Sequence, residues 1–293
     1  MRRLAILLFI TGLFIIVPGA VLLNVVTPGM DLLPDGYRQE SVFQGTYKLL
    51  DSSGERLVEH PVTVSRVRDV TSIESPKAYV TETISVSSPS PGFPESLAQT
   101  HLELAVNRAT RLHMTRVDLF MVADELPTGY MTFPPDVQRD AQYPIWFPDV
   151  IQPVQSTFSG TVERDGLTLY SFGIRAYQLR VWSDCQAHKA RSADVVAEYL
   201  VEPRSGLVVD ERIETTQYVD DDVKGWRVSD VRTLDLTEES VKANLAEAKA
   251  ERFRLVFIGS YVPWLIMGLG MLFGLYGILL VSVWWLRSRG RLA

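Results

Sequence analysis

The sequence predicts an antiparallel, mainly β extracellular domain of α+β character, placed between an N-terminal and a C-terminal transmembrane helix. Two long uncharged segments, Leu4–Val26 and Leu255–Leu286, indicate the helices. Between them, apolar residues recur at every second position and short turn-forming segments interrupt them, which indicates strands joined by hairpins. The expected parts are a cytoplasmic start with the first span (1–27), an extracellular β-rich domain (28–236), a stalk helix with the second span (237–286) and a basic cytoplasmic tail (287–293).

The first uncharged segment, Leu4–Val26, has 23 residues. At about 1.5 Å per residue it is long enough to cross a hydrocarbon core of about 30 Å. Arg2 and Arg3 before it would also suit a secretory signal peptide, but the apolar region of such a peptide is usually about 7–15 residues long. The length, and the lack of a clear Ala-x-Ala site, favour an uncleaved anchor over a cleaved signal.

The second uncharged segment, Leu255–Leu286, has 32 residues, which is too long for a buried helix of a globular domain. Trp264 and Trp284 lie towards its two ends, where aromatic rings favour the headgroup zones. Ahead of it, Thr237 is placed to cap a helix that begins with Glu238. No helix breaker follows before the apolar segment, so we expect the stalk and the span to form one long helix.

Gly270 and Gly274 in the second span are the candidate site for packing between membrane helices. Their small-xxx-small spacing lets another helix approach closely. The partner would be the first span of the same chain or a second copy, which would make a homo-oligomer among the membrane lipids. Glycine is common in membrane helices generally, so the alternative is that this pair has no dimerising role.

Charge is distributed unevenly along the chain. No acidic residue precedes Asp31 or follows Glu251, and residues 27–253 hold 23 basic against 35 acidic side chains. The six basic residues nearest the two spans and the chain ends are Arg2, Arg3, Arg254, Arg287, Arg289 and Arg291. By the positive-inside rule, both termini are cytoplasmic in a two-pass plasma-membrane protein, and residues 28–253 are extracellular. An acidic extracellular part lacks the excess of basic residues that binds nucleic acid.

The alternating segments predict the strands. Val80, Ile84 and Val86 share one strand face, and the polar residues between them share the other. Turn residues at Asp51–Gly54 and Pro203–Gly206 join such segments as hairpins. The candidate strands are Thr46–Leu50, Arg56–Val70, Val80–Val86, Leu102–Val106, Leu112–Met121, Thr157–Glu163, Leu167–Trp182, Val195–Glu202, Leu207–Tyr218 and Trp226–Leu236. The second of these is expected to be interrupted by proline at position 61.

A connector rich in proline and aromatic residues, Leu126–Pro153, separates two halves at about 40–125 and 155–236. Its composition predicts an ordered, packed segment that resists regular secondary structure. Ala105–Leu112 and Leu200–Leu207 match as strand, turn and next strand, which suggests two similar β-meander units. Any hairpin protein gives matches of this kind, so a chain without internal duplication is the alternative.

The connector motifs Gly129–Pro134 and Tyr143–Pro148 resemble those of an actinobacterial family of membrane proteins of unknown function, the PorA-type porins. Gly160–Phe172 and the turn Glu202–Leu207 are similar to the same family, and the likeness covers nearly the whole chain. The resemblance implies an envelope protein held in the plasma membrane, with a role in the transport of solutes. It supplies no catalytic residue and no cofactor.

A porin that crosses the membrane as a β-barrel needs eight or more strands with an uninterrupted apolar outer face, and it needs no apolar helices. Here Arg66, Glu82 and Glu198 stand in or beside the alternating patterns, and the two spans already place the middle of the chain in water. A pore would therefore form from several copies of the helices. The two uncharged segments contain no ionisable side chain to line it.

Residues typical of catalysis or metal binding are scattered. The one cysteine, Cys185, excludes an intrachain disulfide, and its neighbour His188 lacks both an orienting partner and a second metal ligand. Asp220–Asp222 lacks the alternating spacing of a calcium loop and is expected to be a solvated turn. The remaining histidines are His60, His101 and His113. We expect no enzyme, no cofactor and no metal site.

Three functions stay open. The family resemblance favours a transport protein for solutes. A carrier of lipid or another apolar ligand is the first alternative, because the turn Pro203–Leu207 is similar to turns in LolA-like lipid-carrier half-barrels; it requires an apolar cavity of at least a few hundred Å³. A receptor-like or structural scaffold for an envelope protein partner is the second alternative.

Overall fold

The computed structural model describes residues 2–51, 53–114, 127–150, 152–181, 191–221 and 225–289. The chain divides into a helical unit, Met1–Leu32 with Ala250–Ala293, and a sheet domain, Leu33–Lys249. The sheet domain is an antiparallel β structure, and a long apolar helix stands at each end of the chain. The predicted fold class, mainly antiparallel β with terminal helices, is confirmed.

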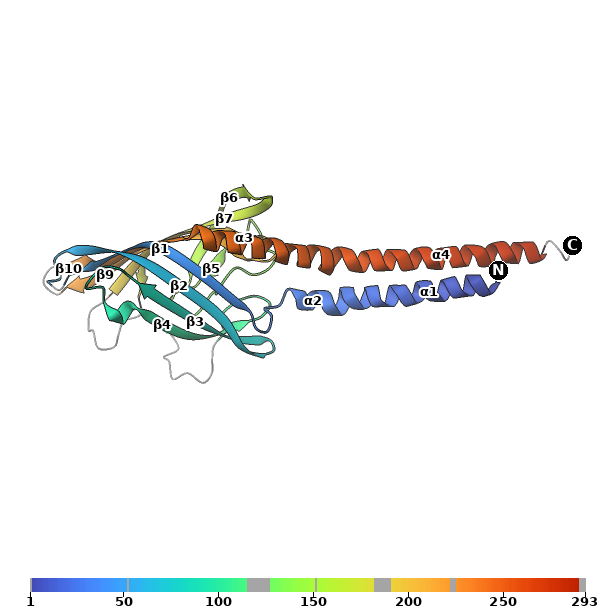
Figure 1. Ribbon diagram of the computed structural model, residues 1–293, viewed down its shortest axis with the longest axis horizontal. Helices are drawn as coiled ribbons and strands as arrows, with labels where there is room; N and C mark the ends of the chain where they lie inside the picture. Colours follow the sequence, from blue (N-terminus) through green and yellow to red (C-terminus); the bar gives the residue numbers. More distant parts are fainter. Residues whose placement is uncertain are drawn as a thin grey trace. The chain divides into compact units, whose positions relative to one another are not determined.

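Ten antiparallel strands form one curled sheet in the order β4-β3-β2-β1-β10-β9-β8-β7-β6-β5 (Figure 1). The strands are β1 (Arg38–Leu50), β2 (Leu57–Glu74), β3 (Lys77–Ser87), β4 (Gln99–Asn107), β5 (Tyr143–Ile145), β6 (Val154–Arg164), β7 (Leu167–Arg180), β8 (Arg191–Val201), β9 (Val208–Asp221) and β10 (Gly225–Leu236). Strands β1 to β4 form one meander and β5 to β10 another, and they meet where β1 pairs with β10. Whether the two meanders arose by duplication stays a prediction.

The expected interruption at Pro61 is wrong, because β2 runs through this residue. Pro61 pairs with Thr46 of β1, whereas the ladder between β2 and β3 begins only at Thr63. The carbonyl of Pro61 accepts a hydrogen bond from Ser88 on the side of β3, at 2.8 Å. The N–H that proline lacks would point to this same side, beyond the end of the ladder, so no sheet hydrogen bond is lost.

The connector is packed as expected, but it contains a strand that its composition did not predict. Strand β5 pairs with β6 at Tyr143–Ile145, and proline at its centre is tolerated because β5 is the edge of the sheet. The ring of Phe133 is fully buried among three aromatic rings of the sheet, with centroids 4.9 Å from Phe172, 5.4 Å from Tyr143 and 5.7 Å from Tyr199. The connector thus supplies part of the core of β5 to β8.

Single bridges join the two edges of the curled sheet at one end. Val106 of β4 bridges to His113, Leu112 bridges to Tyr130, and Tyr130 bridges to Ile145 of β5. The free edge of β4 is therefore connected to β5 around its last residues. Within the described residues, no such bridge continues along the first half of β4. Among the residues that the structure describes, these bridges link the sheet to itself at one end, and none does so at the other.

Helix α3 (Glu238–Phe253) stands where β10 would continue between β1 and β9. The N–H of Thr237 donates to the carbonyl of Val42 at 2.8 Å, and the N–H of Val42 donates to the hydroxyl of Ser240 at 3.0 Å. On the other side, Nδ2 of Asn244 lies 3.5 Å from the carbonyl of Val209. Side chains of the helix therefore replace a backbone ladder along this part of the sheet.

The predicted cap of this helix is confirmed, since the hydroxyl of Thr237 accepts the N–H of Ser240 at 3.3 Å and the first turn carries Glu238. The helical conformation continues as η4 (Arg254–Tyr261), a π-helical segment, and α4 (Val262–Arg289). At the N-terminus, α1 (Arg2–Val21) is followed by η1 (Leu22–Val26) and α2 (Thr27–Met30). Figure 1 shows α1 beside α4.

Among the described residues, two helices could cross a membrane by length and composition: Arg3–Met30 and Glu238–Leu286. They contact each other near their π-helical segments, because the hydroxyl of Thr27, the residue that follows η1, donates to the carbonyl of Gly259 in η4 at 2.8 Å. The N–H groups of Arg254 also reach the carbonyl of Met30 at 2.8 Å. Polar contacts therefore join the two helices of the helical unit at the end opposite the chain termini.

Replacing Phe133 by alanine is expected to destabilise the sheet domain by about 3–5 kcal/mol, because a fully buried ring is removed and a cavity is left. Urea unfolding of the full-length protein in detergent, followed by far-ultraviolet circular dichroism, measures this change. Tyr177→Ala is the matched control, since that ring is 62% exposed on β7 and its loss should change stability by less than about 0.5 kcal/mol. Equal losses in the two variants would contradict the packing of the connector.

Candidate ligand-binding cavity

The inner face of the curled sheet surrounds a cavity of about 230 Å³, which we call the main cavity. Its wall is largely apolar because the alternating residues of β1 to β4, β9 and β10 turn their aliphatic or aromatic members inward. Apolar residues of the wall are Phe43, Val64, Ile84, Val86, Leu102 and Leu234. The connector contributes Phe147 and Pro148 to the same wall.

The main cavity reaches the part of β4 that has no bridge to β5. Leu97, at the end of the short helix η2 (Glu95–Leu97), lines it together with Thr100 and Leu102 from the first half of β4. Asp149 of the connector lines it as well. Within the described residues, the cavity is therefore bounded on this side by a strand edge that has no ladder partner.

A second, small cavity of about 60 Å³ lies next to the main cavity. The two share four lining residues, Arg66, Phe147, Pro148 and Ile213, so these side chains form the partition between them. A space of this size holds a few water molecules. Of these two cavities, the main cavity is the one with room for an organic group.

Four charged side chains form an ion-pair network at this partition. Nη1 of Arg66 donates to Oε1 of Glu211 at 3.1 Å, and Nη2 of Arg66 donates to the other oxygen of the same carboxylate. Nε of Arg68 donates to Oε1 of Glu82 at 2.8 Å, and Nε of Arg66 lies 4.0 Å from that same oxygen. Two guanidinium groups thus balance two carboxylates, and the network carries no net charge.

The network is held against an aromatic surface. The guanidinium carbon of Arg66 lies 4.8 Å from the ring centroid of Phe43. Burial disfavours the charge of Arg66, but the neighbouring carboxylates of Glu211 and Glu82 outweigh this and raise the pKa of the guanidinium above its ordinary value. Arg66 is therefore a permanent cation in the wall of an apolar space.

A second arginine is neutralised in the same manner. Nη1 of Arg232 lies 2.9 Å from Asp149 and its Nε lies 2.9 Å from Asp230, while its guanidinium carbon stands 5.3 Å from the ring centroid of Tyr47. Burial raises the pKa of the Asp230 carboxyl and raises the pKa of Tyr47 to about 12. Arg66, Arg68, Glu82 and Glu211 are largely buried, whereas in the Arg232 network Asp149 remains 44% exposed.

One residue that lines the main cavity has a buried side-chain oxygen without a hydrogen-bond partner. The side chain of Glu82 is completely buried, Oε1 accepts from Arg68, and Oε2 makes no hydrogen bond. Nε1 of Trp146, which lines the small cavity, also has no partner. Buried polar atoms without partners are rare in folded proteins, and those beside a cavity point to a site that accepts a water or a ligand.

His113 is the histidine whose surroundings matter most for stability. Burial, together with the positive charge of Arg68, lowers the pKa of its imidazole to about 3. Its ring packs edge-on against Trp146 with centroids 4.9 Å apart, and its Nε2 makes no hydrogen bond. At neutral pH the imidazole is uncharged and serves as part of the core.

The structure places the predicted glycine pair, Gly270 and Gly274, against the first span of the same chain. A Cβ atom on Gly12 of α1 would come within 2.6 Å of the carbonyl oxygen of Gly270 and of the backbone nitrogen of Gly274. A Cβ atom on Gly270 would lie 2.7 Å from the carbonyl oxygen of Gly12. This close backbone approach requires glycine at positions 12 and 270, whereas a Cβ atom on Gly274 would meet nothing within 4 Å. A contact with a second copy stays a prediction.

The other sequence candidates do not come together with the main cavity. Cys185 and His188 lie outside the described residues. Asp220 and Asp221 are not in a turn as expected, because they end β9 and pair with β10; the third aspartate lies outside the described residues. Within the described residues, no three His, Cys, Asp or Glu side chains form a group that could hold a metal ion.

The ion-pair networks were not predicted from the sequence, although charged residues at inward-facing strand positions indicated them. Glu82 falls on the same alternating face as Val80, Ile84 and Val86, where an acidic residue is unexpected. Arg66 likewise continues the buried face of β2 after Val64. A charge at an inward position predicts a buried partner or a binding role. The partner of Arg66, Glu211, is far away in sequence, so this ion pair can be predicted only when the order of the strands is known.

Removing one member of the Arg66–Glu211 pair is expected to be costly. Arg66→Met leaves a buried carboxylate uncompensated and should lower the free energy of unfolding by about 3–5 kcal/mol. The double variant Arg66→Met/Glu211→Met removes both charges and should regain most of that loss. Urea unfolding of the full-length protein measures both. Lys48→Met, which breaks the exposed pair with Glu59, should change stability by less than about 1 kcal/mol.

Protonation of His113 is expected to weaken the folded state in acid. The unfolded chain binds this proton near pH 6.5 and the folded chain only near pH 3, so stability falls as the pH falls between these values. Between pH 7 and pH 5 the loss is about 2 kcal/mol from this residue. Unfolding of the wild type and of His113→Phe, measured at both pH values, tests this. A pH dependence that is unchanged in the variant would refute the assignment.

Comparison with known proteins gives one family. A family profile described as Porin PorA matches residues 4–279, which is nearly the whole chain. The match includes most of both apolar helices, the ten strands of the sheet and the connector. No curated protein matches the chain.

Proposed function

The chain belongs to the porin PorA family, and from this premise we propose that it is a membrane-anchored envelope protein that binds the apolar part of a ligand inside its sheet. Family membership suggests a porin-like role in the envelope. Porins are generally non-enzymatic, and we propose the same of this chain. Within that role, we favour transport by a carrier over transport by a pore.

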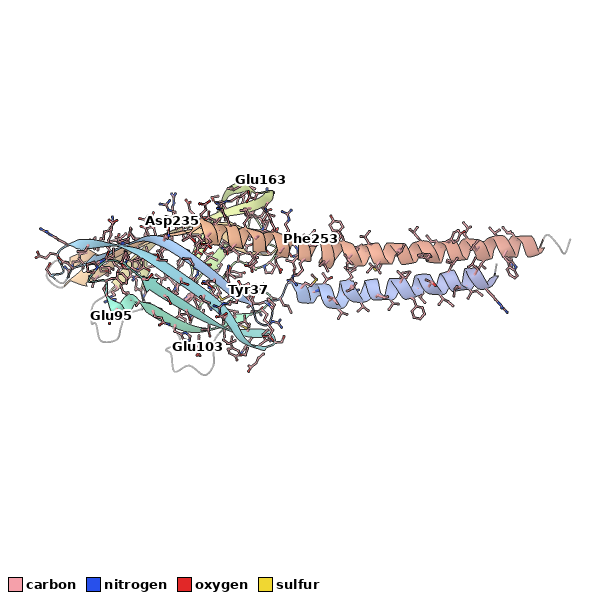
Figure 2. All side chains as sticks on the ribbon, in the orientation of Figure 1. Tyr37, Glu95, Glu103, Glu163, Asp235 and Phe253 are labelled. Atoms are coloured by element: carbon pink, nitrogen blue, oxygen red, sulfur yellow. The ribbon has the colours of Figure 1, made fainter. Side chains whose placement is uncertain are left out.

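The polarity of the sheet carries this proposal. In a barrel that crosses a membrane, the outer face is apolar and the interior is polar. In this sheet the arrangement differs: the main cavity is lined mostly by apolar residues, with its charged side chains joined in ion pairs, and charged side chains also occupy the outside of the strands. Exposed charged residues on the strands include Glu40, Lys48, Arg175, Glu214 and Asp235. In Figure 2, Glu95, Glu103, Glu163 and Asp235 lie at the outer surface of the sheet domain.

The size of the main cavity limits the ligand. At about 230 Å³ it is larger than an engineered cavity of about 150 Å³ that binds benzene, and smaller than the roughly 300–1,000 Å³ of drug-sized sites. It thus falls just short of the few hundred Å³ that a carrier for a whole apolar ligand requires. We therefore propose that it holds one ring or one segment of an apolar chain, with the remainder of the ligand outside past the free edge of β4.

The anchoring helices set where the carrier would work. Two apolar helices with flanking arginines support a two-pass plasma-membrane protein with both termini in the cytoplasm and the sheet domain outside. A domain tethered at both ends stays near the membrane surface. It would receive and release an apolar ligand there rather than diffuse through the envelope.

The pore alternative follows the family description, but the helices give it little support. Leu4–Val26 and Leu255–Leu286 contain no ionisable residue that could line a path for solutes or ions. Close packing of Gly12 against Gly270 also occupies one face of α4 within the chain. Conductance of purified protein in planar bilayers, abolished by deletion of α4, would favour the pore over the carrier.

Filling the main cavity is expected to abolish ligand retention. Ile84→Trp places a large ring in the wall of the cavity, whereas Ser85→Trp on the same strand places it on the exposed outer face. Native mass spectrometry of full-length protein, gently extracted from its own membrane, measures copy number and bound ligand together. We expect ligand on the wild type and on the Ser85→Trp control, and none on Ile84→Trp. A wild-type protein that carries no ligand would refute the carrier proposal.

A further inference from the structure

We propose that the main cavity selects ligands whose apolar chain carries a hydrogen-bond donor, a hydroxyl or an ammonium group, and that Oε2 of Glu82 accepts this hydrogen bond. The inference rests on the proposed function, that is, on binding of an apolar chain in the same cavity. It adds the chemical class of the ligand and the residue that recognises it.

The position of Glu82 on β3 supports this role. Its neighbours on the inner face are Val80 and Ile84, and it pairs across the sheet with Leu102 of β4. Its side chain is completely buried and lines the main cavity. A carboxylate in an otherwise aliphatic stretch of wall is a specific polar contact of the kind that orients ligands in apolar pockets.

Only one of its two oxygens is occupied by the protein. Oε1 of Glu82 accepts from Nε of Arg68 at 2.8 Å and lies 4.0 Å from Nε of Arg66. Oε2 has no hydrogen-bond partner although it is buried. A carboxylate oxygen accepts hydrogen bonds and cannot donate them, so whatever fills the cavity next to Oε2 must supply the donor. A water molecule can supply this donor in the free protein, and a ligand that displaces such a water must replace its hydrogen bond.

The charges around Glu82 argue against an anionic head group. Arg66 is already bound through both Nη atoms by Glu211, and Arg232 is bound by Asp149 and Asp230. Both arginines that line the main cavity are therefore compensated by carboxylates. A fatty acid carboxylate or a phosphate would face Oε2 of Glu82 without a free counter-charge and be repelled. A neutral hydroxyl or a positive ammonium group would be attracted.

The register of the strands also predicts how the ligand is oriented. Ala78 of β3 lies opposite Val106, the residue of β4 that bridges to His113 at the closed end. From Glu82 towards the open end, the wall of β3 continues with Ile84 and Val86, which are apolar. The donor group therefore enters first and meets Glu82, and the apolar chain follows towards the free edge of β4.

Four probes with the same alkyl chain test the proposal: dodecanol, dodecylamine, dodecyl methyl ether and dodecanoate. Each is offered to the full-length protein in lipid nanodiscs, and bound probe is measured by native mass spectrometry. We expect dodecanol and dodecylamine to bind roughly 10- to 100-fold more tightly than the ether and dodecanoate, since a buried hydrogen bond to a carboxylate is lost with the latter two. Comparing the alcohol with the amine decides which donor is preferred.

Glu82→Gln then tests the residue. Its amide oxygen can replace Oε1 as the acceptor for Arg68, which turns the amide N–H groups towards the cavity and should bring the alcohol-to-ether ratio close to one. Glu40→Gln, on the exposed outer face of β1, is the matched control and should keep the wild-type ratio. Because the four probes are compared on the wild type, the proposal stays testable even if Glu82→Gln does not fold.

The outcomes separate this inference from the proposed function. Equal binding of all four probes to the wild type, or a donor preference that persists in Glu82→Gln, would overturn the role of Glu82 and leave the cavity as a binding site. No binding of any probe, together with absence of ligand on the protein from its own membrane, would overturn the proposed function itself.

Discussion

Pairing of β1 with β10 is the interaction on which the rest of the sheet domain depends. It joins the first strand of the domain to the last, with Phe43 opposite Leu236, and so connects the two meanders into one sheet. The curl that encloses the main cavity exists only when this ladder is formed. Because the partners are far apart in sequence, the chain must close a very long loop before this contact can form.

The enclosed charges have a related role. An isolated ion inside an apolar sheet would be strongly destabilising, and an ion pair only approaches balance when its hydrogen bonds are complete. Arg66 meets this condition because β2 and β9 bring it and Glu211 to the same face, while Arg232 from β10 meets Asp149 from the connector. These pairs form across separate parts of the chain. They therefore favour one arrangement of strands and connector over others that would bury similar apolar area.

Local features of the sequence predicted the elements well, and non-local features were not predictable. Alternation around Val80–Val86 identified a strand, and Thr237 before Glu238 identified the start of a helix, because both signals depend on neighbouring residues. The candidate strand Arg56–Val70 was expected to be interrupted at Pro61, and this was wrong because tolerance of the proline depends on where the ladder with β3 begins. The cavity was beyond prediction for the same reason: Glu82, Arg66 and Glu211 belong to three strands whose order the sequence does not reveal.

A helix takes the place of the end of β10 between β1 and β9. The sheet domain therefore opens more easily at this segment than where neighbouring strands are paired. Elsewhere neighbouring strands share a ladder of backbone hydrogen bonds, but between β1 and β9 the chain relies on Ser240, Asn244 and the turn at Thr237. Local opening of this segment breaks few hydrogen bonds and requires no strand to separate from another. Amide groups such as that of Val42 should therefore exchange with solvent through local fluctuations, at a rate that is independent of the global unfolding of the sheet.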